Sequence, residues 1–116
     1  MDRHEAKLLK ALSYIESHLE TPLSTENIST HVGLSQSHFH RLFSVRFGLS
    51  LYDLVKRLRL KRAAYQLAYR QDKVIDIALS AHYQSPEAFS RAFLKVFQQS
   101  PSAFRRSPDW STWHKN

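Results

Sequence analysis

The chain has no cysteine among its 116 residues. A disulfide framework, a thiolate zinc site and a thiol nucleophile are therefore excluded. No apolar run is long enough for a membrane span or for the hydrophobic part of a signal sequence, so we expect a cytoplasmic protein. Only 2 glycines and 4 prolines occur, which favours helices over folds rich in β-turns. We therefore predict an all-α fold.

Acidic residues are scarce and unevenly spread. The chain has 17 lysines and arginines against 10 acids, which gives a net charge of +7 and an isoelectric point of about 10.0. Asp53 is the only acid between Glu26 and Asp72, and no acid lies between Glu87 and Asp109. This balance is typical of nucleic-acid-binding domains. A solvated cationic surface is the alternative, but the positive charge is concentrated where the sequence repeats itself.

The stretch 38–50 returns at 88–100, about fifty residues later, as expected for a duplicated structural unit. His-Phe-His-Arg-Leu-Phe in the first copy corresponds to Ala-Phe-Ser-Arg-Ala-Phe in the second. Each copy follows a short helical stretch, Thr25–Val32 or Val74–Ala81, and a tight turn. Two helices joined by a short turn, duplicated in a basic chain, predict two helix-turn-helix DNA-binding units. The recurring residues are Phe39, Arg41, Phe43, Phe47 and Ser50, which return as Phe89, Arg91, Phe93, Phe97 and Ser100.

Apolar spacing and capping residues predict seven helices. The first runs over Glu5–Leu19, and a long fourth helix runs from Leu51 to about Tyr69. Serines cap the starts of five of the seven helices, and glycines end the second and third helices. The predicted capping serines are Ser24, Ser35, Ser50, Ser85 and Ser100, and the helix-ending glycines are Gly33 and Gly48.

We divide the chain into an N-terminal helix-turn-helix lobe at 1–49, a linker helix at 50–70, a second lobe at 71–107 and a tail at 108–116. Leu51, Leu54 and Val55 on the linker helix would serve the first lobe, and Leu60 and Leu67 the second. This helix would span about 28 Å, close to the ~34 Å of one DNA turn. Two reading helices joined in this way could enter adjacent segments of the major groove.

The outward faces of the third and sixth helices are the predicted reading surfaces. Phenylalanines form the buried stripe of each helix, and polar residues point the other way. Arginine suits guanine O6 and N7, glutamate can accept from cytosine N4, and leucine can touch a thymine methyl group. The predicted base-contacting residues are Ser37, His40, Arg41, Ser44, Glu87, Ser90 and Arg91. The predicted phosphate-contacting residues are Gln36, Arg46, Lys56, Arg57, Lys61, Arg62, Lys95 and Arg105.

The seven histidines do not form a metal-binding pattern. His38 and His40 are two residues apart and face different sides of a helix, and no histidine set has chelating spacing. No glycine-flanked nucleophile is present for a hydrolytic triad. We therefore expect no metal, no cofactor and no enzymatic activity.

The sequence resembles the AraC/XylS family of bacterial transcription activators, from about Leu8 to Arg106. The second half carries the most specific part of the resemblance, Phe89-Ser90-Arg91-Ala92-Phe93 with Ser100-Pro101 and Phe104-Arg105. Its nearest likeness is to the MarA/SoxS/Rob subgroup. The resemblance implies two helix-turn-helix lobes joined by a linker helix, binding of a monomer to an asymmetric promoter site in double-stranded DNA, and recruitment of RNA polymerase.

The chain departs from that subgroup at its reading positions. Ser37 and His40 replace a tryptophan and a glutamine, and Pro86-Glu87 replaces two glutamines, so the subgroup's target sequence does not carry over. His82 stands where many members have glycine. Three alternatives remain open: the DNA-binding part of a longer ligand-sensing regulator, a module of a DNA-repair methyltransferase, and a protein-interaction adaptor. The lack of cysteine excludes thiol methyl transfer within this chain.

Overall fold

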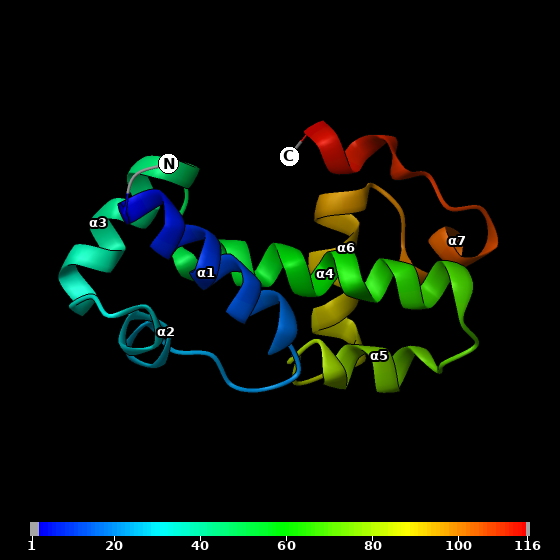
Figure 1. The fold of residues 1–116 in the computed structure, drawn as a ribbon. Helices are drawn as coiled ribbons and strands as arrows, with labels where there is room; N and C mark the ends of the chain where they lie inside the picture. The colour runs from blue at the N-terminus through cyan, green and yellow to red at the C-terminus, as the bar shows by residue number, and fades with distance from the viewer. Residues whose placement is uncertain (1–2, 116) are drawn as a thin grey trace. The chain divides into compact units, whose positions relative to one another are not determined.

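The computed structural model describes residues 3–115 (Figure 1). No strand occurs among these residues, which confirms the predicted all-α class. No helix in this part of the chain is both long and apolar enough to cross a membrane. The α-helices are α1 (Arg3–Ser17), α2 (Thr25–Val32), α3 (Gln36–Phe47), α4 (Leu51–Tyr69), α5 (Val74–Ser80), α6 (Pro86–Phe97) and α7 (Pro101–Arg106). A 3₁₀ helix, η1, follows at Trp110–Lys115.

Two compact units make up the chain, Met1–Leu58 and Arg59–Asn116. In the first unit, α1, α2, α3 and the first half of α4 bury a core that includes Ile15, Ile28 and Phe43. In the second, the rest of α4 packs with α5, α6 and α7 around a core rich in phenylalanine. The α4 residues divide between these cores as their spacing predicts. Leu51 and Val55 belong to the first core, and Leu60, Ala63, Ala64 and Leu67 belong to the second.

Serine caps fix where the helices begin. The side chains of Ser24, Ser35, Ser85 and Ser100 each accept a hydrogen bond from the backbone N–H three residues on. Ser50 does the same for α4, at 3.1 Å from the N–H of Asp53. Each bond satisfies one of the N–H groups that a helix start leaves without a partner. The five predicted serine caps are therefore confirmed.

The first helix differs from its prediction at both ends. It begins at Arg3 and ends at Ser17, whereas the apolar spacing predicted Glu5–Leu19. Beyond Ser17 the chain tightens into a turn, in which the N–H of His18 binds the carbonyl of Ile15 at 3.1 Å. Leu19 remains buried although it lies outside the helix, so the spacing identified a core residue but not its backbone conformation.

Candidate nucleic-acid interface

The first helix of each helix-turn-helix pair ends with the same hydrogen-bond pattern. In the first, the N–H groups of Gly33 and Leu34 bind the carbonyls of Thr30 and Ser29, at 3.2 and 2.9 Å. In the second, the N–H groups of His82 and Tyr83 bind the carbonyls of Leu79 and Ala78, both at 3.0 Å. Both are Schellman motifs, in which the chain leaves the last turn of the helix through a residue in the left-handed conformation.

In the second turn a non-glycine residue holds the left-handed position, and the turn is one residue longer. Gly33 has φ +76°, and His82 holds the equivalent position at φ +67°. Gln84 is then inserted before the capping Ser85, whereas Leu34 is followed directly by Ser35. The histidine predicted to replace a family glycine therefore adopts the glycine-like conformation.

A ladder of phenylalanine rings fixes the rotation of each reading helix about its axis. Phe39, Phe43 and Phe47 on α3 pack against one another in sequence as tilted pairs, with ring centroids 5.5 and 4.7 Å apart. On α6 the rings of Phe89, Phe93 and Phe97 lie 5.6 and 4.5 Å apart. Five of these six rings are fully buried, and Phe47 is half-buried. Since aromatic packing of this kind is directional, the opposite face of each helix is held toward solvent.

The predicted base-contacting residues lie on these outward faces. Ser37, His40 and Arg41 on α3 are exposed, and Ser44 is half-buried. On α6, Glu87 and Arg91 are exposed and Ser90 is half-buried, so the two helices present matched positions. Neither Arg41 nor Arg91 has a hydrogen bond or ion pair with any residue in the described part of the chain.

The predicted phosphate-contacting residues fall into two groups. Gln36, Lys56 and Lys95 are exposed, and Arg57 and Arg62 are half-buried. For Arg46, Lys61 and Arg105 the contacts made within the protein can be named. The Nε atom of Arg46 lies 3.2 Å from the carboxylate of Glu5 on α1.

Arg105 has a structural role that the sequence did not reveal. Its guanidinium donates hydrogen bonds to the carbonyl oxygens of Leu67 (3.1 Å), Arg70 (3.2 Å) and Asp72 (2.7 Å). These carbonyls lie at and just beyond the C-terminal end of α4, where helix carbonyls lack intrahelical partners. A cation there also stabilises the negative end of the helix dipole. The side chain thus joins α7 to the end of α4.

Lys61 lies over the indole ring of Trp113, with Nζ 6.0 Å from the ring centroid. Together with Tyr65, Tyr69 and Trp110 these residues line a groove of about 300 Å³ between α4 and η1. The indole of Trp113 stacks on Phe97 at 5.5 Å, and Thr112 Oγ1 donates to the carbonyl of Phe97 at 2.9 Å. The tail predicted at 108–116, whose structure the sequence left open, therefore packs against the second core through Trp110 and Trp113.

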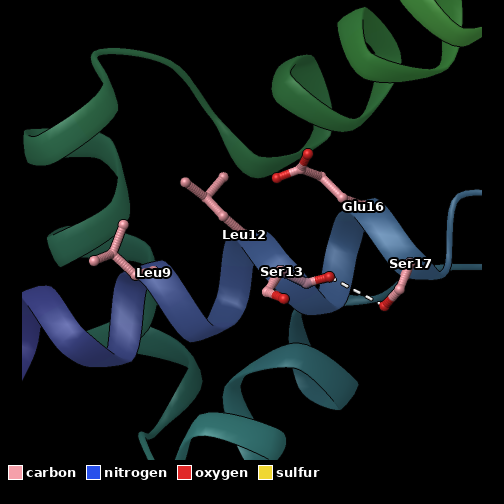
Figure 2. A pocket seen from close by; sticks show the side chains of 5 residues that line it. All are labelled: Leu9, Leu12, Ser13, Glu16 and Ser17. Atoms are coloured by element: carbon pink, nitrogen blue, oxygen red, sulfur yellow. Dashed lines mark hydrogen bonds between the residues drawn. The ribbon is translucent and has the colours of Figure 1, made fainter.

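A second hollow, of about 480 Å³, lies along α1 in the first unit (Figure 2). It is lined by Leu9, Leu12, Ser13, Glu16 and Ser17, and the Ser17 hydroxyl donates to the Ser13 carbonyl at 3.0 Å. None of the predicted DNA-contacting residues lines it.

Two of the histidines pack against each other. The rings of His4 and His38 meet edge to face, with centroids 5.2 Å apart. Among the side chains that the structure describes, residues 3–113, no three from histidine, aspartate or glutamate come together in a metal-binding arrangement. His38 therefore braces α3 against α1, while His40 is exposed on the reading face.

Two similar units, each presenting a polar helix after a short helix and a tight turn, define a double helix-turn-helix DNA-binding domain. A helix-turn-helix domain model matches residues 28–107. The chain belongs to the AraC-type family of helix-turn-helix DNA-binding transcriptional regulators.

Known proteins agree with this assignment. The chain is 38% identical over 102 residues to YbfP, an uncharacterized HTH-type transcriptional regulator of Bacillus subtilis. The match covers 88% of this chain and 35% of YbfP. The chain is 36% identical, with the same two coverages, to the right origin-binding protein of Escherichia coli. The chain thus spans about a third of the length of these relatives.

A solved structure shows the same fold. The crystal structure of a transcriptional regulator with an AraC-type DNA-binding domain, from Chromobacterium violaceum, has a TM-score of 0.82 and 31% identity. The match covers 90% of this chain and 96% of that one. At 22% identity and a TM-score of 0.76, the DNA-binding domain of AdpA, in complex with a target DNA, also shares the fold over 86% of this chain and 90% of that one.

Proposed function

We propose that this chain binds one asymmetric site in double-stranded DNA as a monomer and places α3 and α6 in adjacent segments of the major groove. The observation that carries the proposal is the state of Arg41 and Arg91. Both are exposed at matched positions on the two reading helices, and neither has a polar partner in the described part of the chain. Arg46, Arg70 and Arg105, by contrast, are each held by the protein.

A free guanidinium on a helix face is suited to bidentate recognition of guanine O6 and N7. Such a contact forms without first breaking an ion pair inside the protein, so less of its free energy is lost. We therefore assign guanine contacts to Arg41 and Arg91. The neighbouring polar residues differ, since His40 and Ser37 accompany Arg41 whereas Glu87 and Ser90 accompany Arg91. The two helices should therefore recognise two different blocks of sequence, and one chain supplies both readers.

The biological role that fits this chemistry is activation of transcription through RNA polymerase bound nearby. It requires binding and no catalysis, and it places the protein where chromosomal DNA lies, which is the cytoplasm in a bacterium. A related candidate is the DNA-binding part of a longer ligand-sensing regulator. It is favoured by the length comparison, because the chain matches about a third of YbfP and of the right origin-binding protein.

In vitro selection of bound DNA from a random pool, followed by sequencing, tests the proposal. Wild-type protein should enrich a motif with two unlike blocks. Arg41→Ala and Arg91→Ala should each cost about 1–3 kcal/mol of binding free energy and relax base choice in one block only. Arg3→Ala removes an exposed arginine on α1, outside the reading helices, and should leave the motif unchanged. An unchanged motif after both reading-helix substitutions would refute the assignment.

Salt dependence supplies an independent test of the same proposal. Each neutralised phosphate should lower the logarithm of the affinity by about 0.9 per tenfold rise in salt. Lys56→Ala and Lys95→Ala should each make that slope shallower by about 0.9, the value of one phosphate contact, and leave the selected motif intact. An affinity that does not change between low and physiological salt would contradict binding to the DNA backbone.

A further inference from the structure

One exposed residue on the outward face of α6 is apolar. Leu94 is 50% exposed and lies outside the second core, whereas Phe89, Phe93 and Phe97 on the same helix are fully buried. Isolated exposed leucines are common on protein surfaces and carry no meaning by themselves. Leu94 is of interest because it lies on the surface of α6 that we assign to DNA binding.

Helix geometry places Leu94 among the predicted readers. At 3.6 residues per turn, Glu87, Arg91 and Leu94 fall within about 60° of one another around the axis of α6. Leu94 therefore lies one turn further along the face that carries Arg91. In the first copy the matched residue is Ser44, which is polar and half-buried, so the apolar side chain distinguishes the two reading surfaces.

We propose that Leu94 reads the C5 methyl group of a thymine in the block bound by α6. The inference rests on the proposed function, since it requires α6 to lie in the major groove. The thymine methyl is the only apolar group that a standard base presents there, and an aliphatic side chain recognises it by contact. Binding would remove both the leucine and the methyl group from water, whereas Ser44 offers no such gain at the first block.

Deoxyuridine is the probe, because it pairs like thymidine and lacks only the C5 methyl. Each thymine of the selected site is replaced in turn, and affinity is measured with wild type, Leu94→Ala and Leu94→Met. In the α6 block, one replacement should weaken wild-type binding about fourfold, the effect of losing one buried methyl group. Leu94→Ala should bind the two DNAs equally, whereas Leu94→Met, which keeps an apolar side chain of similar reach, should retain most of the discrimination.

Val45→Ala is the matched control. Val45 is 87% exposed on α3 and is not among the predicted DNA contacts, so its removal should leave the fourfold effect in the α6 block unchanged. Circular dichroism of each variant confirms that the helices are intact.

Three results would overturn the inference about Leu94. They are an α6 block without thymine, no deoxyuridine effect within that block, and an effect that persists in Leu94→Ala. In each of these cases a selected motif that responds to Arg91→Ala would leave the proposed function standing. If no motif is selected at all, the proposed function fails and the role of Leu94 fails with it.

Discussion

Gly48 and Gln98 occupy the same place in the two copies, directly after α3 and α6. Both adopt left-handed backbone conformations, with φ +71° at Gly48 and φ +60° at Gln98. Each N–H binds the carbonyl four residues before it, at 2.8 Å. For an L-residue with a Cβ atom this conformation costs roughly 1–2 kcal/mol, a cost that glycine avoids. The second copy therefore carries a conformational cost that the first does not.

Exchanging the residue types should change stability in opposite directions. Gln98→Gly should raise the free energy of unfolding by about 1 kcal/mol, because only an exposed bond from Nε2 to the Lys95 carbonyl is lost. Gly48→Ala should lower it by about 1 kcal/mol, since a Cβ there meets nothing within 4 Å and only the backbone cost remains. Urea unfolding measures both. A loss of stability in Gln98→Gly would show that its side-chain bond outweighs the backbone strain.

Residues whose roles depend on near neighbours in sequence were predictable. The capping serines act on N–H groups three residues away, and the phenylalanine ladders follow helical spacing. Arg105 was predicted to contact phosphate, but its partners Leu67 and Asp72 are more than thirty residues away in sequence. Only tertiary packing brings them together, and no local pattern signals it. Whether Arg105 also contacts DNA stays a prediction.

At the scale of the helices, the end of α4 depends on Arg105. Arg105→Ala leaves three carbonyl oxygens without their charged donor and should lower the free energy of unfolding by about 1–3 kcal/mol. Arg106→Ala is the control, because Arg106 is exposed on the same short helix and its removal should change stability by less than about 0.5 kcal/mol. Thermal unfolding of both variants measures the difference. Equal effects would show that the Arg105 bonds contribute no net stability.

Helix α4 itself matched its prediction closely, because Ser50 caps its start and no glycine or proline interrupts it. The sequence left the structure of the segment after α7 open, because the short 3₁₀ helix η1 is held by groups both near and distant in sequence. Thr112 and Trp113 contact Phe97, at least fifteen residues away. Asp109 binds the N–H and hydroxyl of Ser111, and the indole of Trp110 meets Phe104 at 5.1 Å. Tryptophan spacing alone could not show which core these rings would join.

At the scale of the whole molecule, α4 runs without a break from the first core into the second. If this helix sets the distance between the two readers, the two blocks of the site should lie about 10 base pairs apart, centre to centre. Inserting five base pairs should then turn one block to the opposite side of the DNA and lower the affinity at least about tenfold. Footprinting on the altered sites measures the effect. Unchanged affinity would show that α4 does not fix the register.

A helix-breaking substitution tests the same idea from the protein side. Ala64→Pro removes a backbone hydrogen bond in the buried part of α4 and should cost about 3 kcal/mol or more. If the variant remains folded by circular dichroism, it should bind normal and altered spacings with similar weak affinity. Retention of the wild-type preference for one spacing would contradict the role assigned to α4.

Both tryptophans belong to the second unit, where Trp113 stacks on Phe97 and Trp110 meets Phe97 and Phe104 edge to face. Indole fluorescence therefore observes only one half of the chain, whereas circular dichroism observes the helices of both. Phe39→Ala, in the core of the first unit, should cost about 3–5 kcal/mol. We expect the dichroism to show an early transition while the emission midpoint stays near that of the wild type. Coincident transitions would instead mean that α4 makes the two halves a single cooperative unit.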